Sequence, residues 1–222
     1  VHDIVQKVMA NMQISGSVSG MHGVFKDMND AINASIEAQK KVCTMTLDQR
    51  EQIISLIRKK THENAEILAN MGVNETGMGN VGDKILKHHL TADKVPGTED
   101  ISTIAWSGDR GLTLVEMGPF GVIGAITPAT NPSETVICNC IGMLAGGNTV
   151  VFNPHPNAKK TTIYTINMIN EASIEAGGPD NIAVTVEAPT LETSAIIMKH
   201  PSIHLLEATG GPGVVTAVLS SG

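Results

Sequence analysis

Short apolar runs alternate with longer amphipathic stretches over the second half of this chain. The runs at residues 122–126 and 149–152 are apolar, partly β-branched and flanked by Gly, Pro or Asn, as buried strands are, and residues 182–186 and 203–206 are predicted as two further strands. Helical patterns connect and follow them at residues 133–144, 157–176, 191–199 and 213–220. Four strands alternating with helices predict an α/β fold, a doubly wound, Rossmann-like parallel sheet with right-handed crossovers.

The first half of the chain reads mainly as helices that precede this sheet. Apolar positions at helical spacing predict a helix over residues 24–41, and Thr46 with Gln49 forms a capping-box signal for a helix to about Asn70. The glycine-rich stretch 72–82 has no preceding strand and no GK[ST] sequence, so we interpret it as a loop. Residues 112–117 alternate loosely and predict a further strand.

The amino-terminal residues predict a separate element. Val1, Ile4, Val5, Val8, Met9 and Met12 recur at helical spacing, and residues 15–20 have the Ser/Gly composition of a flexible linker. We therefore divide the chain into a helix and linker at 1–20 and a domain at 21–222. The helix either docks on another protein or folds back on its own domain, and its sequence is compatible with both.

Composition narrows the classes of partner. The formal charge of −7 argues against nucleic acid as a partner, since proteins that bind it usually carry a basic patch. No apolar run approaches the roughly 20 residues that span a bilayer, so no membrane partner is expected. Cys43, Cys138 and Cys140 make no plausible disulfide framework and fit a reducing compartment.

Three turns at predicted strand ends carry candidate chemistry. Residues 127–132 (TPATNP) follow the first strand, residues 153–156 (NPHP) follow the second, and residues 209–213 (TGGPG) precede the last helix. Ligands of parallel sheets bind outside the carboxyl ends of strands, and glycines let the backbone approach a phosphate closely. The alternative is that these are ordinary strand-to-helix turns with prolines and caps at helix starts.

These segments resemble a known family. GPFGVIGAITPATNPSET, VVFNPHPNAKK and ATGGPGVV are similar to segments of the CoA-acylating aldehyde dehydrogenases. ETGMGN and ADKVPGTED resemble the branch that oxidises acetaldehyde or propionaldehyde inside bacterial microcompartments. The resemblance implies an enzyme that converts a short-chain aldehyde, CoA and NAD into acyl-CoA and NADH. It also implies that residues 1–12 are an address for a microcompartment shell protein in the bacterial cytoplasm, and that the full-length protein is a homo-oligomer.

The resemblance also implies roles for individual residues. Asn131 is the candidate oxyanion donor, although a gapless match to non-acylating relatives places Thr130 there. Related non-acylating enzymes carry a lysine and a glutamate where this chain has Asn153 and Pro156, which leaves the choice between NAD and NADP open. Lys159 and Lys160 fall in the first turn of a helix and indicate either a nearby anion or a solvated pair. The candidate cofactor-binding residues are Thr127, Pro128, Ala129, Thr130, Asn153, His155, Pro156, Lys159, Thr209, Gly210, Gly211 and Val214.

The family's chemistry requires a reactive cysteine that forms a thiohemiacetal and then a thioester. Cys138 and Cys140 are two residues apart in a predicted helix and match no catalytic motif, and Cys43 lies between helices. The resemblance therefore implies that the nucleophile lies beyond Gly222 and that this chain is the cofactor-binding part. Two alternatives are a non-catalytic nucleotide-binding or targeting module and the aldehyde dehydrogenase part of a bifunctional aldehyde-alcohol dehydrogenase.

Two histidine pairs are candidates for metal ligands, but neither pattern favours a site. His200 and His204 lie in a turn into a strand without a completing acidic residue, and His88 with His89 is interpreted as a surface pair. We expect no metal site.

Overall fold

The strand β4 (Val122–Thr127) is buried at all six of its residues and lies inside a five-stranded parallel sheet. The structure is a computed structural model that describes residues 20–221. In the sheet, β4 pairs with β5 (Thr149–Pro154) on one side and with β7 (Ile203–Ala208) on the other. The order is completed beyond β5 by β6 (Ala183–Val186) and β1 (Val24–Phe25). The predicted doubly wound parallel sheet is confirmed.

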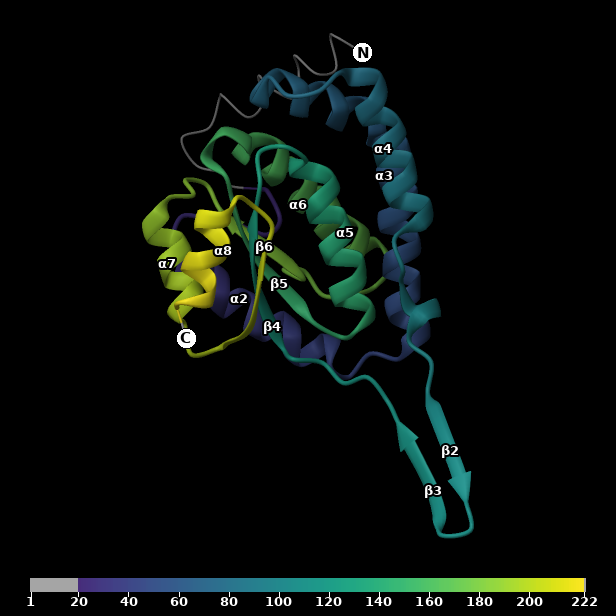
Figure 1. Ribbon diagram of the computed structural model, residues 1–222. Helices are drawn as coiled ribbons and strands as arrows, with labels where there is room; N and C mark the ends of the chain where they lie inside the picture. The colour runs from purple at the N-terminus through teal and green to yellow at the C-terminus, as the bar shows by residue number, and fades with distance from the viewer. Residues whose placement is uncertain (1–19, 222) are drawn as a thin grey trace.

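Helices cover both faces of the sheet (Figure 1). One face packs on α5 (Pro132–Ala145) and α6 (Lys159–Glu175), and α3 (Leu47–Thr76) covers these two helices from outside. The other face packs on α2 (Met28–Val42) and α7 (Leu191–Lys199). The remaining helical elements are α4 (Val81–Lys94), α8 (Pro212–Leu219), and the short 3-10 segments η1 (Thr98–Asp100) and η2 (Pro156–Ala158).

Alternation along the strands divides the core into two clusters. Ala125, Val150 and Phe152 belong to the cluster under α5 and α6, whereas Val122 and Val151 belong to the cluster under α2 and α7. This is the division that successive side chains on opposite faces of a sheet produce. At Gly124 a Cβ would lie 2.4 Å from Ile197 Cγ2, so glycine there allows α7 to pack close to the sheet.

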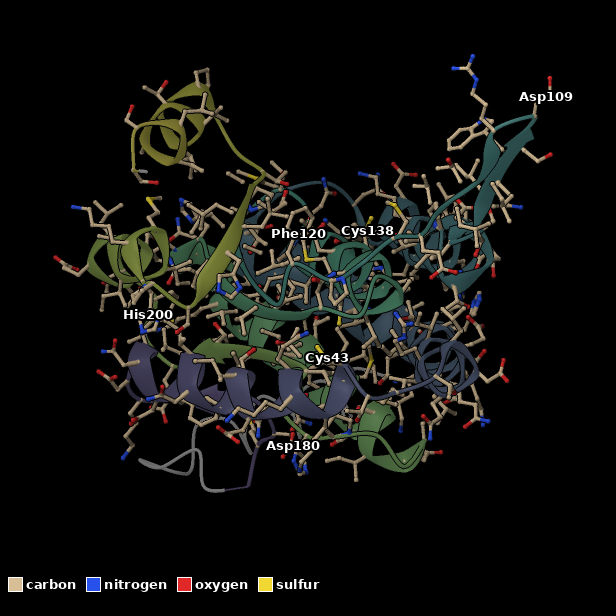
Figure 2. All side chains as sticks on the ribbon, turned by 90° about the horizontal axis from the view of Figure 1, so that it is seen from below. Cys43, Asp109, Phe120, Cys138, Asp180 and His200 are labelled. Carbon is tan, nitrogen blue, oxygen red and sulfur yellow. The ribbon has the colours of Figure 1, made fainter. Side chains whose placement is uncertain are left out.

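A hairpin extends away from this body (Figure 1). Its strands β2 (Ile104–Gly108) and β3 (Gly111–Val115) are antiparallel and exposed at every residue, including the apolar Trp106, Leu112 and Leu114. Figure 2 shows Asp109 at its tip, far from the sheet. The expected strand at 112–117 is therefore β3, but its partner β2 was not predicted from the sequence.

Two expectations for the first half of the chain were wrong. Residues 24 and 25 form β1 and the helix starts only at Met28, because the Asp27 carboxylate caps it by accepting from Asn29 N and Asp30 N. The stretch 72–82 is mostly helical: α3 continues to Thr76 and α4 starts at Val81, so the loop is reduced to residues 77–80. Gly77, with φ of 68°, ends α3 in the left-handed conformation that helix ends favour.

The amino-terminal helix and most of its linker, residues 1–19, lie outside the described residues. Between residues 20 and 221, no helix has the combination of length and apolar character that crossing a membrane requires.

Glu75 connects the end of α3 to the start of α6. Its carboxylate accepts hydrogen bonds from Lys160 N at 2.7 Å, Thr161 N at 2.8 Å and Thr161 Oγ1 at 2.7 Å. An anion is favourable at a helix amino terminus, where backbone N–H groups lack partners. Lys159 and Lys160 do lie in the first turn of α6, and the anion beside that turn is this glutamate of the chain itself.

Replacement of Glu75 by alanine leaves these donors without an acceptor, so we expect the free energy of unfolding to fall by about 1–2 kcal/mol. Urea denaturation measures the change. The matched control is Glu66→Ala on the exposed face of the same helix, which should change stability by less than about 0.5 kcal/mol. Equal effects of the two substitutions would contradict the capping role.

Candidate functional site

The turns after β4, β5 and β7 enclose a cavity of about 470 Å³. β4 is the strand at which the connections change direction, because β5 and β6 extend the sheet on one side of it and β7 on the other. Crevices at such a point, at the carboxyl ends of the strands, are where open α/β sheets bind ligands. Ten of the twelve predicted cofactor residues line this cavity: Thr127, Pro128, Ala129, Asn153, His155, Pro156, Thr209, Gly210, Gly211 and Val214.

Thr130 and Lys159 are the two predicted residues that do not line the cavity. Thr130 is exposed and directs its carbonyl oxygen to Lys84 Nζ at 3.0 Å. Lys159 begins α6 behind the turn after β5. Sequence reasoning missed the wall that α7 provides, which includes Thr190, Leu191, Ser194 and Met198.

The amide of Asn153 is used inside the protein. Its Nδ2 donates to Ser194 Oγ at 2.6 Å, and its Oδ1 accepts from Thr193 Oγ1 at 2.6 Å. Asn153 is buried, so these bonds fix the end of β5 against the start of α7. The residue therefore shapes the cavity wall and has little hydrogen-bonding capacity left for a ligand.

Unlike Asn153, Thr127 has a side-chain polar group without a hydrogen-bond partner among the described residues. It is 3% exposed, it lines the cavity, and its Oγ1 has no hydrogen-bond partner among the described residues. A buried hydroxyl without a partner costs about 1–3 kcal/mol. The strand end thus places a buried, unsatisfied hydroxyl in the wall of the cavity.

The start of α8 also lacks a side-chain partner. Its N-cap is Gly211 and its first residue is Pro212, so no side chain caps it. A Cβ at Gly211 or Gly213 would meet nothing within 4 Å, so the backbone borders open space. Backbone N–H groups in this arrangement suit a phosphate.

The lining of the cavity carries no formal charge from Asp, Glu, Lys or Arg among the described residues. His155 is the one ionisable side chain in the described lining, and the Nδ1 atom of the His155 ring accepts a hydrogen bond from Asn157 N at 3.1 Å. Anion recognition in this cavity would therefore depend on backbone groups rather than on cations.

Asn131 lies on a second, smaller cavity of about 360 Å³, together with Cys138 of α5 and Thr209. Its side chain makes no cap hydrogen bond to α5, although it occupies the N-cap position. Instead, Asn131 Oδ1 accepts from Lys87 Nζ at 3.2 Å. This contact leaves the Nδ2 group, the donor half of the amide, available to a ligand.

His88 is fully buried, so its interpretation as half of a surface pair was wrong. Its Nδ1 lies 2.7 Å from Lys84 O and its Nε2 lies 2.7 Å from Ser133 Oγ. Since a carbonyl only accepts, Nδ1 carries the proton and donates to Lys84 O. Burial lowers the pKa of His88; the charge of Glu134 and the hydrogen bond to Lys84 O oppose this shift, while the charges of Lys84 and His89 add to it.

The three cysteines differ in environment. Burial raises the pKa of the Cys140 thiol to about 12. Burial and the nearby Glu207 raise the pKa of Cys138, which lies on α5 (Figure 2). Cys43 accepts from Gln39 Nε2, which also donates to Gly147 O just before β5, so Cys43 lies near the amino end of the sheet. Burial thus disfavours the reactive thiolate form at Cys138 and Cys140, and Cys43 does not line the larger cavity.

Over residues 20–221, no three His, Cys, Asp or Glu side chains gather closely enough to hold a metal ion. His204 Nδ1 lies 2.9 Å from Phe120 O, and His200 ends α7.

The sequence model of the family described as "Aldehyde dehydrogenase family" matches residues 12–222 of this chain. This chain belongs to the aldehyde dehydrogenase family. An acetylating acetaldehyde dehydrogenase of Bilophila wadsworthia is 49% identical over 201 residues, which are 90% of this chain and 41% of that protein. The resemblance to the CoA-acylating members of the family is thereby confirmed.

Solved structures of aldehyde dehydrogenases agree with the fold. A propionaldehyde dehydrogenase from the Clostridium phytofermentans fucose utilisation bacterial microcompartment is 72% identical, with a TM-score of 0.89 over 90% of this chain and 46% of that one. Rhodopseudomonas palustris propionaldehyde dehydrogenase with bound CoA and an acylated cysteine is 48% identical, with a TM-score of 0.88 over the same shares. The chain spans less than half the length of these relatives.

The buried His88 predicts a dependence of stability on pH. Its pKa is lower in the folded state than in the unfolded state, where it lies near 6.5. Above that pH, His88 is neutral in both the folded and the unfolded state. As the pH falls below it, the unfolded state binds the proton first, so the free energy of unfolding falls by up to about 1.4 kcal/mol per pH unit.

Urea denaturation between pH 7.5 and 5.5 tests this dependence. His88→Gln should remove a large part of the acid destabilisation, whereas the control His200→Gln should keep it. An identical pH dependence in all three proteins would contradict the assignment.

Proposed function

We propose that the protein containing this chain is an NAD-dependent, CoA-acylating aldehyde dehydrogenase. It converts a short-chain aldehyde, propionaldehyde or acetaldehyde, together with CoA and NAD into acyl-CoA, NADH and a proton. The observation that carries the proposal is the cavity of about 470 Å³ at the carboxyl ends of β4, β5 and β7. The names of the relatives, acetylating acetaldehyde dehydrogenase and propionaldehyde dehydrogenase, supply the reaction.

In this proposal the cavity holds the nucleotide. NAD, when bound, accepts the hydride of the substrate. The backbone at Gly210 and Gly211 and the uncapped start of α8 would receive the pyrophosphate, and the free hydroxyl of Thr127 would bond the cofactor from the opposite wall. The described lining contains no Asp or Glu side chain that would repel the phosphates of NAD or CoA.

Asn131 is proposed as the oxyanion donor. Lys87 Nζ donates a hydrogen bond to Asn131 Oδ1, so the Nδ2 group of Asn131 is free to donate toward the smaller cavity. Thr130 lines neither this cavity nor the larger one, which favours Asn131 over Thr130 for this role. A preorganised donor of this kind typically contributes about 10²- to 10³-fold to the rate.

The nucleophile is proposed to be a cysteine beyond Gly222. A thiolate is required for attack on the aldehyde, and the environments of Cys138 and Cys140 raise the pKa values of their thiols. Cys43 lies at the amino end of β5, opposite the end where the cavity opens.

The proposal extends to partners and location. We propose that residues 1–12 address the protein to a microcompartment shell protein in the bacterial cytoplasm, in keeping with the source of the 72% identical relative. The exposed apolar residues of the β2–β3 hairpin support self-association of the intact protein.

Thr127→Val tests the cavity. Valine removes an unpartnered buried hydroxyl, so stability should be kept or raised by up to about 1 kcal/mol. Affinity for NAD, measured by isothermal titration calorimetry, should nevertheless fall by about 3- to 10-fold. Thr162→Val is the matched control, because Thr162 Oγ1 is also buried without a described partner but lies outside the cavity. Unchanged affinity in Thr127→Val would contradict the assignment.

The reaction is tested with the natural gene product that contains this chain. We expect NADH and propionyl-CoA in equal amounts when propionaldehyde, CoA and NAD are all present, and no NADH when the aldehyde is omitted. Cys43→Ala and Cys138→Ala should each keep the turnover within about twofold, because Cys43 lies at the amino end of β5 and burial raises the pKa of Cys138. Loss of turnover in either variant would place the nucleophile inside this chain.

A further inference from the structure

Lys84 of α4 is a buried cation directed at the turn after β4. Its side chain is 4% exposed, and its Nζ lies 3.0 Å from Thr130 O and 3.3 Å from Glu134 Oε1. The Glu134 side chain is 8% exposed. Burying such a pair costs several kcal/mol per ion unless further hydrogen bonds compensate. The cluster therefore needs a reason beyond filling space, since apolar side chains fill a core at lower cost.

Ser133 and His88 connect α4 to the first turn of α5. With the Nδ1 proton of His88 donated to Lys84 O, the Ser133 hydroxyl donates its one proton to His88 Nε2 at 2.7 Å. Ser133 Oγ lies 3.2 Å from Glu134 Oε2 but has no second proton to donate there, so Lys84 is the cation that compensates this carboxylate. The imidazole and the hydroxyl thus hold the first turn of α5 on one side while the ammonium of Lys84 faces the turn before it.

A second lysine of the same helix contacts the same turn. Lys87 is three residues after Lys84, so the two lie on one face of α4. Lys84 bonds the backbone of Thr130, and Lys87 bonds the side chain of Asn131. Two adjacent residues are therefore held by two neighbouring cations, one through the main chain and one through the amide oxygen.

We propose that Lys84 is a positioning residue for the reaction: by holding the Thr130 carbonyl, it fixes the orientation in which Asn131 presents its Nδ2 group to the smaller cavity. This proposal rests on the proposed function, in which Asn131 stabilises the oxyanion. Lys84 itself is too buried to touch a substrate. Its effect reaches the reacting atoms only through the geometry of the turn.

The test uses the natural gene product with Lys84→Met, which keeps the length of the side chain and removes the ammonium. We expect kcat to fall by about 10- to 100-fold, since small misplacements of a reacting group cost about that much. The KM for NAD should change by less than about threefold. Lys60→Met is the matched control: Lys60 Nζ pairs with Glu175 at 2.9 Å between α3 and α6, away from the turn, and its loss should leave kcat unchanged.

A second variant separates positioning from stability. Lys84→Met alone leaves Glu134 unpaired, so the protein should also become less stable. Lys84→Met combined with Glu134→Leu removes both charges and should recover most of the stability while the loss in kcat remains. Recovery of kcat together with stability, or an unchanged kcat in Lys84→Met, would overturn the proposal.

Hydrogen–deuterium exchange gives a readout independent of turnover. The amide of Thr135, which donates to Asn131 O at 3.1 Å, should exchange at least tenfold faster in Lys84→Met than in Lys60→Met, and equal rates would overturn the anchoring role. If wild-type protein shows no acylating activity, the proposed function fails while the exchange result still decides whether Lys84 anchors the turn. If Asn131→Ala keeps full activity, the oxyanion role fails, and with it the catalytic part of the Lys84 proposal.

Discussion

The pairing of β4 with a parallel strand on each side is the constraint on which the rest of this structure depends. All six of its residues are buried between two layers of helices, so its polar chemistry can appear only where the strand ends. Because β5 and β7 run parallel to it, the turns after all three strands are brought to one edge of the sheet. The proline and glycine residues of these turns then surround a cavity that none of them could form alone.

Different contacts hold the lining residues of the two cavities beside this edge in place. The larger one is bordered by main-chain groups and by an Asn153 side chain whose amide is already bonded to α7. The smaller one presents the amide of Asn131, which is held by α4 through Lys87, while Lys84 holds the preceding carbonyl. The proposed nucleotide site and the proposed donor site are thus supported by different helices, although Thr209 lines both cavities.

Much of the sheet and of the larger cavity could be predicted from the sequence. The strands around Val122 and Thr149 are apolar runs between turn residues, and this signal is local. The turn residues that follow them could be assigned to a site because parallel strands place their carboxyl ends together. The resemblance to acylating aldehyde dehydrogenases supplied the expected cofactor-binding role of Thr209, Gly210 and Gly211. The sequence pattern of these residues alone does not distinguish a phosphate-binding turn from an ordinary strand-to-helix turn.

The cluster behind the Asn131 turn could not be predicted in this way. Lys84 and His88 lie on a helix whose sequence carries charged and polar residues throughout, and such residues are normally solvated. Their burial results from the packing of α4 against α3 and α5, which brings together residues 45 or more positions apart. The hairpin partner β2 was missed for a related reason, since an exposed strand has no buried face to give its pattern a period.

We propose that the edge formed by β4, β5 and β7 binds the nucleotide. Hydrogen–deuterium exchange of the natural protein with and without NAD tests it most directly. We expect protection of the backbone amides of the non-proline residues in 127–131, 153–157 and 209–215, and no protection in the glycine-containing loop at 77–80. Protection confined to that loop, or absent from all three turns under saturating NAD, would contradict it.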